Sequence, residues 1–275
     1  MDIRLALSLL SAAVLLLAAS CTDDAAVMSE LDAAEFVMED YPETALAILD
    51  TMQRSRLVSR EAAARHALLY SQALDKNYVD MTTDSIIRPA VEYYSRHGSA
   101  DERLKAQYYL GCIYRNLGDP EKAMECYVRA ERYVDRAEDY KAVGRLYSAK
   151  RKVYFDYYDL SLSYAEAIKS EHYYKLSGDS LLRAKALINA ALSASILNYN
   201  HLADSILSVV RDSLWGVLGP DIQGGYYSVF MTMAEEKGDT AQKLFKFYSK
   251  IILWQRYASW LRAYRPCIHS QWSVS

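Results

Sequence analysis

The pattern of apolar and polar positions is clearest between residues 103 and 134. Two apolar faces at helical spacing lie there, the first made by Leu110, Gly111 and Tyr114 and the second by Ala123, Tyr127 and Ala130. The sequence Gly118-Asp119-Pro120 separates them, and glycine followed closely by proline interrupts a helix. Small residues let two helices approach and large ones interlock, so the stretch predicts two helices joined by a tight turn.

Weaker versions of the same pattern occur on both sides. We expect helix pairs at residues 31–39 and 44–52, 62–74 and 84–96, 137–158 and 162–176, 181–197 and 201–212, and 226–237 and 240–255. Eighty residues after the first helix of the clearest pair, Ala190, Ala191 and Ala194 occupy the equivalent positions. No stretch sustains a period of two, so no sheet is expected. Because a single pair cannot bury its apolar face, the chain predicts an all-α array of about six stacked pairs.

The helix–turn–helix of residues 103–134 resembles the tetratricopeptide repeat. Two further phrases, LDAAEFVMEDYPETALAILDTM (31–52) and RHALLYSQALDKNYVDMTTDSIIRPAVEYYSRHG (65–98), resemble the opening repeats of tetratricopeptide proteins of Bacteroidota envelopes. The resemblance implies a right-handed solenoid over residues 31–255, whose first helices line a concave groove for a ligand. Longer members continue into a membrane span, whereas residues 256–275 lack an apolar run of roughly twenty residues. We interpret that atypical tail as truncated, frame-shifted or unfolded.

The N-terminus has the features of an export signal. Arg4 precedes an apolar run from Leu5 to Ala19, which at about fifteen residues is short for a bilayer span. The sequence Leu17-Ala18-Ala19-Ser20-Cys21 resembles a bacterial lipobox, although Ala18 stands where Leu is usual. We expect a signal peptide over residues 1–20, a lipid anchor at Cys21, a short linker over residues 21–30, and a place in the cell envelope on the periplasmic or surface side of the outer membrane. The alternative is ordinary cleavage that leaves a soluble periplasmic protein.

Composition narrows the class of partner. The 32 Lys and Arg residues nearly balance the 35 Asp and Glu residues. Nucleic-acid binding needs a basic patch, so no nucleic-acid partner is expected. Cys112 and Cys126 lie on the two helices of one pair. We interpret them as small apolar core residues with free thiols, with a disulfide as the alternative in an exported protein.

Tyrosine is abundant, with 24 copies against five Phe and four Trp. The resemblance assigns six residues to groove positions that face a partner: Gln72, Lys105, Tyr108, Arg115, Asn116 and Arg145. Three of them, Lys105, Arg115 and Arg145, are suited to hold a carboxylate such as a peptide C-terminus through charge-assisted hydrogen bonds. The alternatives are that the tyrosines only pack the repeats, and that these cations form i,i+4 pairs on a solvated helix face.

Motifs for catalysis and metal binding are absent from the sequence. HExxH, GxSxG and GxxxxGK[ST] do not occur, and the five histidines are scattered. We therefore expect no enzyme, no cofactor and no metal, and predict a scaffold that binds a protein or peptide in its groove. Two alternatives stay open: the sensory repeat half of a truncated membrane signalling protein, and a glycan-binding lipoprotein.

Overall fold

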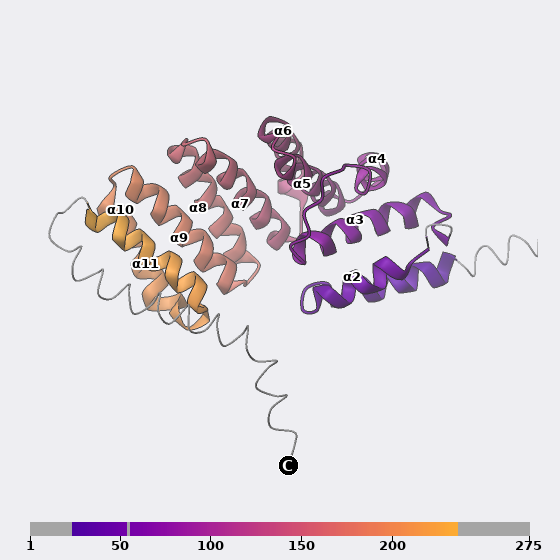
Figure 1. Cartoon of the computed structure of the whole chain (residues 1–275), viewed down its shortest axis with the longest axis horizontal. Helices are drawn as coiled ribbons and strands as arrows, with labels where there is room; N and C mark the ends of the chain where they lie inside the picture. Colours follow the sequence, from indigo (N-terminus) through magenta and orange to yellow (C-terminus); the bar gives the residue numbers. More distant parts are fainter. Residues whose placement is uncertain (1–23, 54–55, 236–275) are drawn as a thin grey trace, which may run out of the picture. The chain divides into compact units, whose positions relative to one another are not determined.

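The computed structural model describes residues 24–53 and 56–235 and is helical throughout its regular elements, with no strand in these ranges (Figure 1). A helix over residues 24–37 comes first. It is followed by α2 (Pro42–Thr51), α3 (Arg60–Lys76), α4 (Arg88–His97), α5 (Ala100–Asn116), α6 (Pro120–Glu131), α7 (Tyr140–Asp156), α8 (Leu160–Leu176), α9 (Ser180–Ile196), α10 (Asn200–Val209) and α11 (Pro220–Glu235). Neighbouring helices pack in pairs, which confirms the all-α class and is compatible with a helical solenoid.

The first helices of successive pairs begin at a constant interval. Helices α3, α5, α7, α9 and α11 start at residues 60, 100, 140, 180 and 220, so their starts are 40 residues apart. The residue before each of the first four caps the helix through its side chain. Ser59, Ser99, Asp139 and Asp179 each accept a hydrogen bond from the backbone N–H three residues further along. A side-chain oxygen here pairs one of the N–H groups that a helix start leaves without a partner.

The turns inside the pairs repeat at the same interval. Tyr78, Gly118, Tyr158 and Asn198 follow α3, α5, α7 and α9, and all have positive φ angles. A residue in the left-handed region ends a helix and reverses the chain, and glycine adopts it without steric cost. The structure therefore repeats in 40-residue steps, although glycine occupies only one of the four turn positions.

Several boundaries differ from the sequence predictions. Helix α11 begins at Pro220 rather than at residue 226, and α4 begins at Arg88 rather than at residue 84. Residues 24–30, expected as part of a linker, are helical, and Val27 is fully buried against the helix pair that follows. Helix α7 begins at Tyr140 rather than at residue 137, because Asp139 caps it. The predicted signal peptide, Cys21, the helix over residues 240–255 and the tail over residues 256–275 lie outside the described residues.

The chain divides into two compact units, the first ending at Ala142 and the second beginning at Val143 within α7. In the first unit, Gly111 of α5 lies directly against the ring of Tyr127 of α6. A glycine at this position allows the two helices to approach closely, as the sequence pattern predicted. Tyr127 is fully buried between them.

The second unit combines an apolar core with buried polar contacts. Helices α8, α9 and α10 lie side by side (Figure 1), and alanines of α9 fill their contact. The Lys150 ammonium lies 3.2 Å from the Glu166 carboxylate, and both side chains are buried. The Ser170 hydroxyl donates to the Gly144 carbonyl over 2.9 Å. These contacts join α7 to α8 through hydrogen bonds as well as apolar packing.

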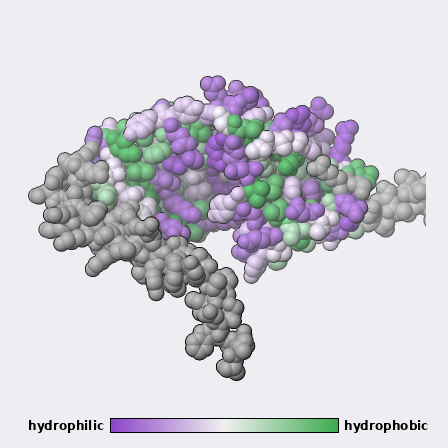
Figure 2. All heavy atoms as spheres, in the orientation of Figure 1, coloured by the Kyte–Doolittle hydropathy of each residue, from purple (hydrophilic) through white to green (hydrophobic). Residues whose placement is uncertain are grey.

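Hydrophobic side chains on the face drawn in Figure 2 lie in small groups between hydrophilic ones. Within residues 24–53 and 56–235, no helix is long and apolar enough to span a membrane.

Candidate functional site

The first unit contains a pocket of about 250 Å³ where its first helices meet. The pocket lies between the helix over residues 24–37, α3, α4 and α5. We call it the α3 pocket. It is lined by Met28, Glu35, Glu61, Arg65, Leu68, Leu69, Gln72, Tyr94, Glu102 and Lys105. A larger depression of about 520 Å³ is lined by side chains at the start of α3 and along α4, but its charged members, such as Arg60 and Arg96, are exposed. The α3 pocket differs from this depression in that two of its polar side chains, Gln72 and Tyr94, are buried.

One face of α3 provides half of the pocket. Glu61, Arg65, Leu68 and Gln72 are spaced by three or four residues, so they follow one side of the helix. The Ser59 cap fixes where this helix starts and hence which residues this side presents. The local sequence therefore places the Glu61 carboxylate, the Leu68 side chain and the Gln72 amide along one side of α3.

The two cations of the pocket are already paired. Arg65 forms ion pairs with Asp32 and Glu35. The ammonium of Lys105 lies 2.6 Å from the carboxylate of Asp139. The pocket and its ion-pair partners therefore hold more carboxylates than cations.

The two other carboxylates of the pocket, Glu61 and Glu102, form no ion pair with a described residue. The Ser99 backbone N–H donates to one oxygen of Glu102 over 2.7 Å, as part of a capping box. Glu61 is exposed and has no ion pair or hydrogen bond within the described part of the chain. Both carboxylates are available to a cation from outside the protein.

Two buried polar side chains face the pocket without a protein partner. Gln72 is 8% exposed and Tyr94 is 3% exposed. Neither the Gln72 amide nor the Tyr94 hydroxyl forms a hydrogen bond with any described residue. Their polar atoms are not among the fully buried side-chain atoms that lack a hydrogen-bond partner, so they reach the solvent of the pocket and are open to a ligand.

The pKa of Tyr94 is raised by its burial and by the charges around the pocket. Burial raises the pKa of its phenol above the ordinary value. The neighbouring carboxylates of Glu102, Glu35 and Glu61 raise this pKa further, and Arg65 opposes them. The phenol is therefore a neutral hydrogen-bonding group at physiological pH, beside negative charge.

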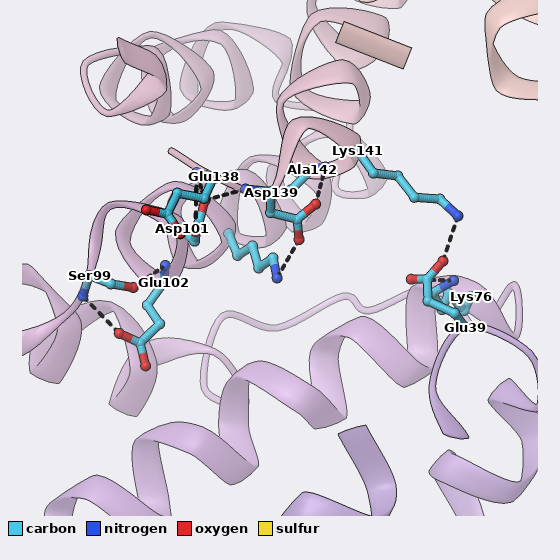
Figure 3. A network of polar contacts seen from close by, with 10 residues as sticks. Glu39, Lys76, Ser99, Asp101, Glu102, Glu138, Asp139, Lys141 and Ala142 are labelled. Carbon is cyan, nitrogen blue, oxygen red and sulfur yellow. Dashed lines mark hydrogen bonds and ion pairs between the residues drawn. The ribbon is translucent and has the colours of Figure 1, made fainter. Parts of the chain in front are cut away.

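A network of polar contacts holds the start of α7 in place (Figure 3). Glu39 pairs with Lys76 over 3.0 Å and with Lys141 over 2.8 Å. The carboxylate of Asp101 accepts hydrogen bonds from the backbone N–H groups of Glu138 and Asp139, both over 3.0 Å. The network links the ends of three successive first helices, which gives the pocket a firm frame.

The structure brings together two of the six predicted groove residues. Gln72 and Lys105 line the α3 pocket. Tyr108 does not: it is 9% exposed and its ring packs edge-on against Tyr109 and near Tyr127. Tyr108 thus lies in the contact of α5 with α6, because its position on α5 points into the pair rather than toward an open face.

The three remaining predicted residues lie elsewhere. Arg115 and Asn116 are half-buried at the end of α5 and do not line the α3 pocket. Burial lowers the pKa of Arg115, but nearby groups, led by Cys112, more than offset it and leave a net rise. Arg145 belongs to the second unit. The charge of Lys105 is balanced by Asp139, so the pocket contains no free cation of the expected carboxylate clamp.

Sequence reasoning did not select the pocket carboxylates or Tyr94. The helical spacing of Glu61 with Arg65 and Gln72 was a usable signal for Glu61, and Tyr94 is the second member of a Tyr-Tyr pair. Their convergence, however, depends on α4 and α5 packing on α3, which spacing alone does not reveal.

The two cysteines of the α5–α6 pair are not joined by a disulfide. Cys112 and Cys126 are both buried and carry free thiols, which confirms the interpretation from sequence.

Among the residues that the structure describes, no group of three or more His, Cys, Asp and Glu side chains is arranged to hold a metal ion. Comparison of the chain with protein-family models, with curated proteins and with solved structures gives no match.

Proposed function

We propose that the chain is a non-enzymatic scaffold that binds a protein or peptide in the α3 pocket. The observation that carries this proposal is the pair of buried groups, Gln72 and Tyr94, that face the pocket without a protein partner. A peptide supplies both hydrogen-bond donors and acceptors along its main chain, which matches an amide and a phenol. The ion-paired frame around the pocket keeps these groups in position, and a pre-organised site loses less entropy when it binds.

The proposed architecture is a right-handed solenoid of about six tetratricopeptide-like pairs. The close approach of Gly111 to Tyr127 and the pairing of adjacent helices support it. The 40-residue interval between first helices is longer than the roughly 34 residues of the tetratricopeptide repeat. First helices of 17 residues, such as α3 and α5, account for part of this extra length.

The proposed location is the cell envelope, with a lipid anchor at Cys21 after export. The support is the apolar N-terminal run and the small residues before the cysteine. Labelled palmitate should enter the full chain in its native host, and replacing Cys21 by Ser should abolish the labelling. Equal labelling of both versions would contradict the anchor.

Photo-cross-linking tests the proposed binding directly. A photoreactive amino acid replaces Met28, a half-buried pocket residue, in the full chain expressed in the native host. The matched control carries the same group at Val128 on α6, which lies outside the pocket. We expect a discrete polypeptide adduct from position 28 and none from position 128.

Two results would contradict the proposal. Adducts of the same proteins from both positions would place binding outside the pocket. A polysaccharide adduct from position 28 would replace the peptide with a glycan and favour the lipoprotein alternative.

A further inference from the structure

The α3 pocket is lined mainly by charged and polar side chains, with a smaller apolar patch made by Met28, Leu68 and Leu69. Counting the pocket residues and their ion-pair partners, five carboxylates (Asp32, Glu35, Glu61, Glu102 and Asp139) face two cations, Arg65 and Lys105. The cations are occupied by Asp32, Glu35 and Asp139. The carboxylates exceed the cations by three charges, and Glu61 and Glu102 are the two that form no ion pair with a described residue. An anionic ligand group would meet this charge as a repulsion, whereas a cation would neutralise it.

The apolar patch lies beside these carboxylates. Leu68 and Leu69 of α3, and Met28 of the first helix, line the pocket beside the Tyr94 ring. Long basic side chains bury their methylene groups against such surfaces while keeping the charged end on polar groups. The guanidinium of arginine also forms paired hydrogen bonds with a carboxylate and stacks on aromatic rings.

The volume of the α3 pocket limits the kind of ligand group that fits it. Pockets for small organic ligands usually measure about 300–1,000 Å³. The α3 pocket, at about 250 Å³, is below that range and suits a single side chain of a larger partner. The Gln72 amide offers one donor group and one acceptor, the same pair that a main-chain peptide group requires.

We infer that the α3 pocket binds a basic side chain of a polypeptide, with Glu61 and Glu102 holding its charge, Tyr94 accepting or donating a hydrogen bond at its tip, and Gln72 pairing with the adjacent main chain. This inference rests on the proposed function and names the chemistry of its ligand. Arginine is the preferred residue because it makes two hydrogen bonds to one carboxylate.

The test is a selection of peptides on the full chain in detergent. Random dodecapeptides displayed on phage are selected on the immobilised protein, and the bound peptides are sequenced and synthesised. We expect enrichment of Arg or Lys at one fixed position. Replacing that residue by norleucine, which keeps the aliphatic stem without the charge, should weaken binding by about tenfold or more, the loss of one charge-assisted hydrogen bond.

Three variants of the protein assign the contacts. Glu61→Lys reverses a charge on an exposed side chain without a protein partner, and Tyr94→Phe removes only a hydroxyl. Gln72→Met keeps the volume and removes the amide. The matched control is Glu43→Lys, because Glu43 is also an exposed acid in the first turn of a helix but lies on α2 outside the pocket.

We expect Glu61→Lys to weaken the selected peptide by at least about tenfold and Glu43→Lys to leave it unchanged. Tyr94→Phe and Gln72→Met should each weaken it by several-fold, with unaltered circular dichroism. Peptides selected without a basic residue, or bound equally by Glu61→Lys and Glu43→Lys, would overturn the inference while leaving peptide binding intact. A selection that enriches no peptide would overturn both the inference and the proposed function.

Discussion

Gly111 of α5 lies directly against the ring of Tyr127 of α6. A Cβ atom at this position would lie 2.7 Å from Cδ1 of Tyr127, closer than van der Waals contact allows. Tyr127 is fully buried and cannot move aside without disturbing the helix contact. The same arrangement recurs in the second unit, where a Cβ at Gly144 would lie 2.6 Å from Cδ1 of Tyr174.

We predict that Gly111→Ala lowers the free energy of unfolding by about 1–2 kcal/mol. Overpacking costs about 1–3 kcal/mol, and the better helix propensity of alanine returns part of it. Gly216→Ala is the control, because no atom lies within 4 Å of the added Cβ there and its φ is not in the left-handed region. Urea unfolding of the full chain measures both, and an unchanged midpoint for Gly111→Ala would show that the two helices separate more easily than the structure indicates.

The two buried thiols link stability to pH. Burial raises the pKa of Cys112 and of Cys126 to about 11, whereas an unfolded thiol has a pKa of about 8.5. Their contribution to stability is therefore fully present below about pH 8.5 and is lost as the pH rises from there toward about 11.

We predict that the unfolding free energy falls between pH 8 and pH 9.5, roughly the range in which the unfolded thiols ionise. In the Cys126→Ala variant the fall should be shallower. The same burial should make both thiols react with a disulfide reagent at pH 8 at least about a hundred times more slowly than in urea, in a variant whose Cys21 and Cys267 are serine. Rapid labelling of the folded chain would contradict the packing of α5 on α6.

The second helices of the pairs differ in whether a side chain caps their first turn. Asp119 and Asp159 precede α6 and α8, and each side chain accepts a hydrogen bond from the backbone N–H three residues further along. Tyr199 occupies the equivalent place before α10 with similar backbone angles, but it makes no capping hydrogen bond and is exposed. The second helix of this pair therefore starts without the cap that its neighbours have.

We predict that Tyr199→Asp stabilises the protein by about 1 kcal/mol, the usual value of an N-cap. Asp159→Ala should destabilise it by a similar amount. Thermal unfolding and hydrogen exchange of residues 200–209 measure the change. No gain in protection within α10 would mean that the turn before it differs from the turns at Gly118 and Tyr158.

The helices were predictable where local chemistry decides them. Gly118, Asp119 and Pro120 encode a turn, a cap and a first helical residue in three consecutive positions, and the helices on both sides match the prediction. Residues 24–30 were missed because the buried face of that helix, which includes Val27, only becomes visible when α2 and α3 pack against it. The 40-residue interval was only partly visible, because Tyr78 and Tyr158 occupy turn positions where glycine is the usual signal.

The candidate site was less predictable than the fold. Gln72 and Lys105 were selected from their place on first helices, and both line the pocket. Tyr108 lies three residues further along α5, about 60° around the helix from Lys105, and is buried because its ring packs on Tyr109 and near Tyr127. Which charges remain unpaired depends on contacts such as Lys105 with Asp139, and these follow from tertiary structure alone.

At the scale of the whole molecule, the proposed function depends on local charge that the net charge of the chain does not reveal. The chain has a formal net charge of only −3, yet the α3 pocket concentrates carboxylates around buried polar groups. Binding of a basic peptide there should weaken as salt increases, because the rim of the pocket is exposed. Binding that is insensitive to salt would point to the apolar patch of Met28, Leu68 and Leu69 as the main source of affinity.

Zero-length cross-linking tests the central claim most directly. A lysine is placed at the fixed basic position of a selected peptide. A carbodiimide joins its amine to a carboxylate that it contacts, with loss of water, and mass spectrometry of the full chain locates the new amide bond. We predict that the bond forms at Glu61 or Glu102, and that excess unlabelled peptide prevents it. Bonds formed as often at the exposed carboxylates Glu43 and Glu125 would contradict the account.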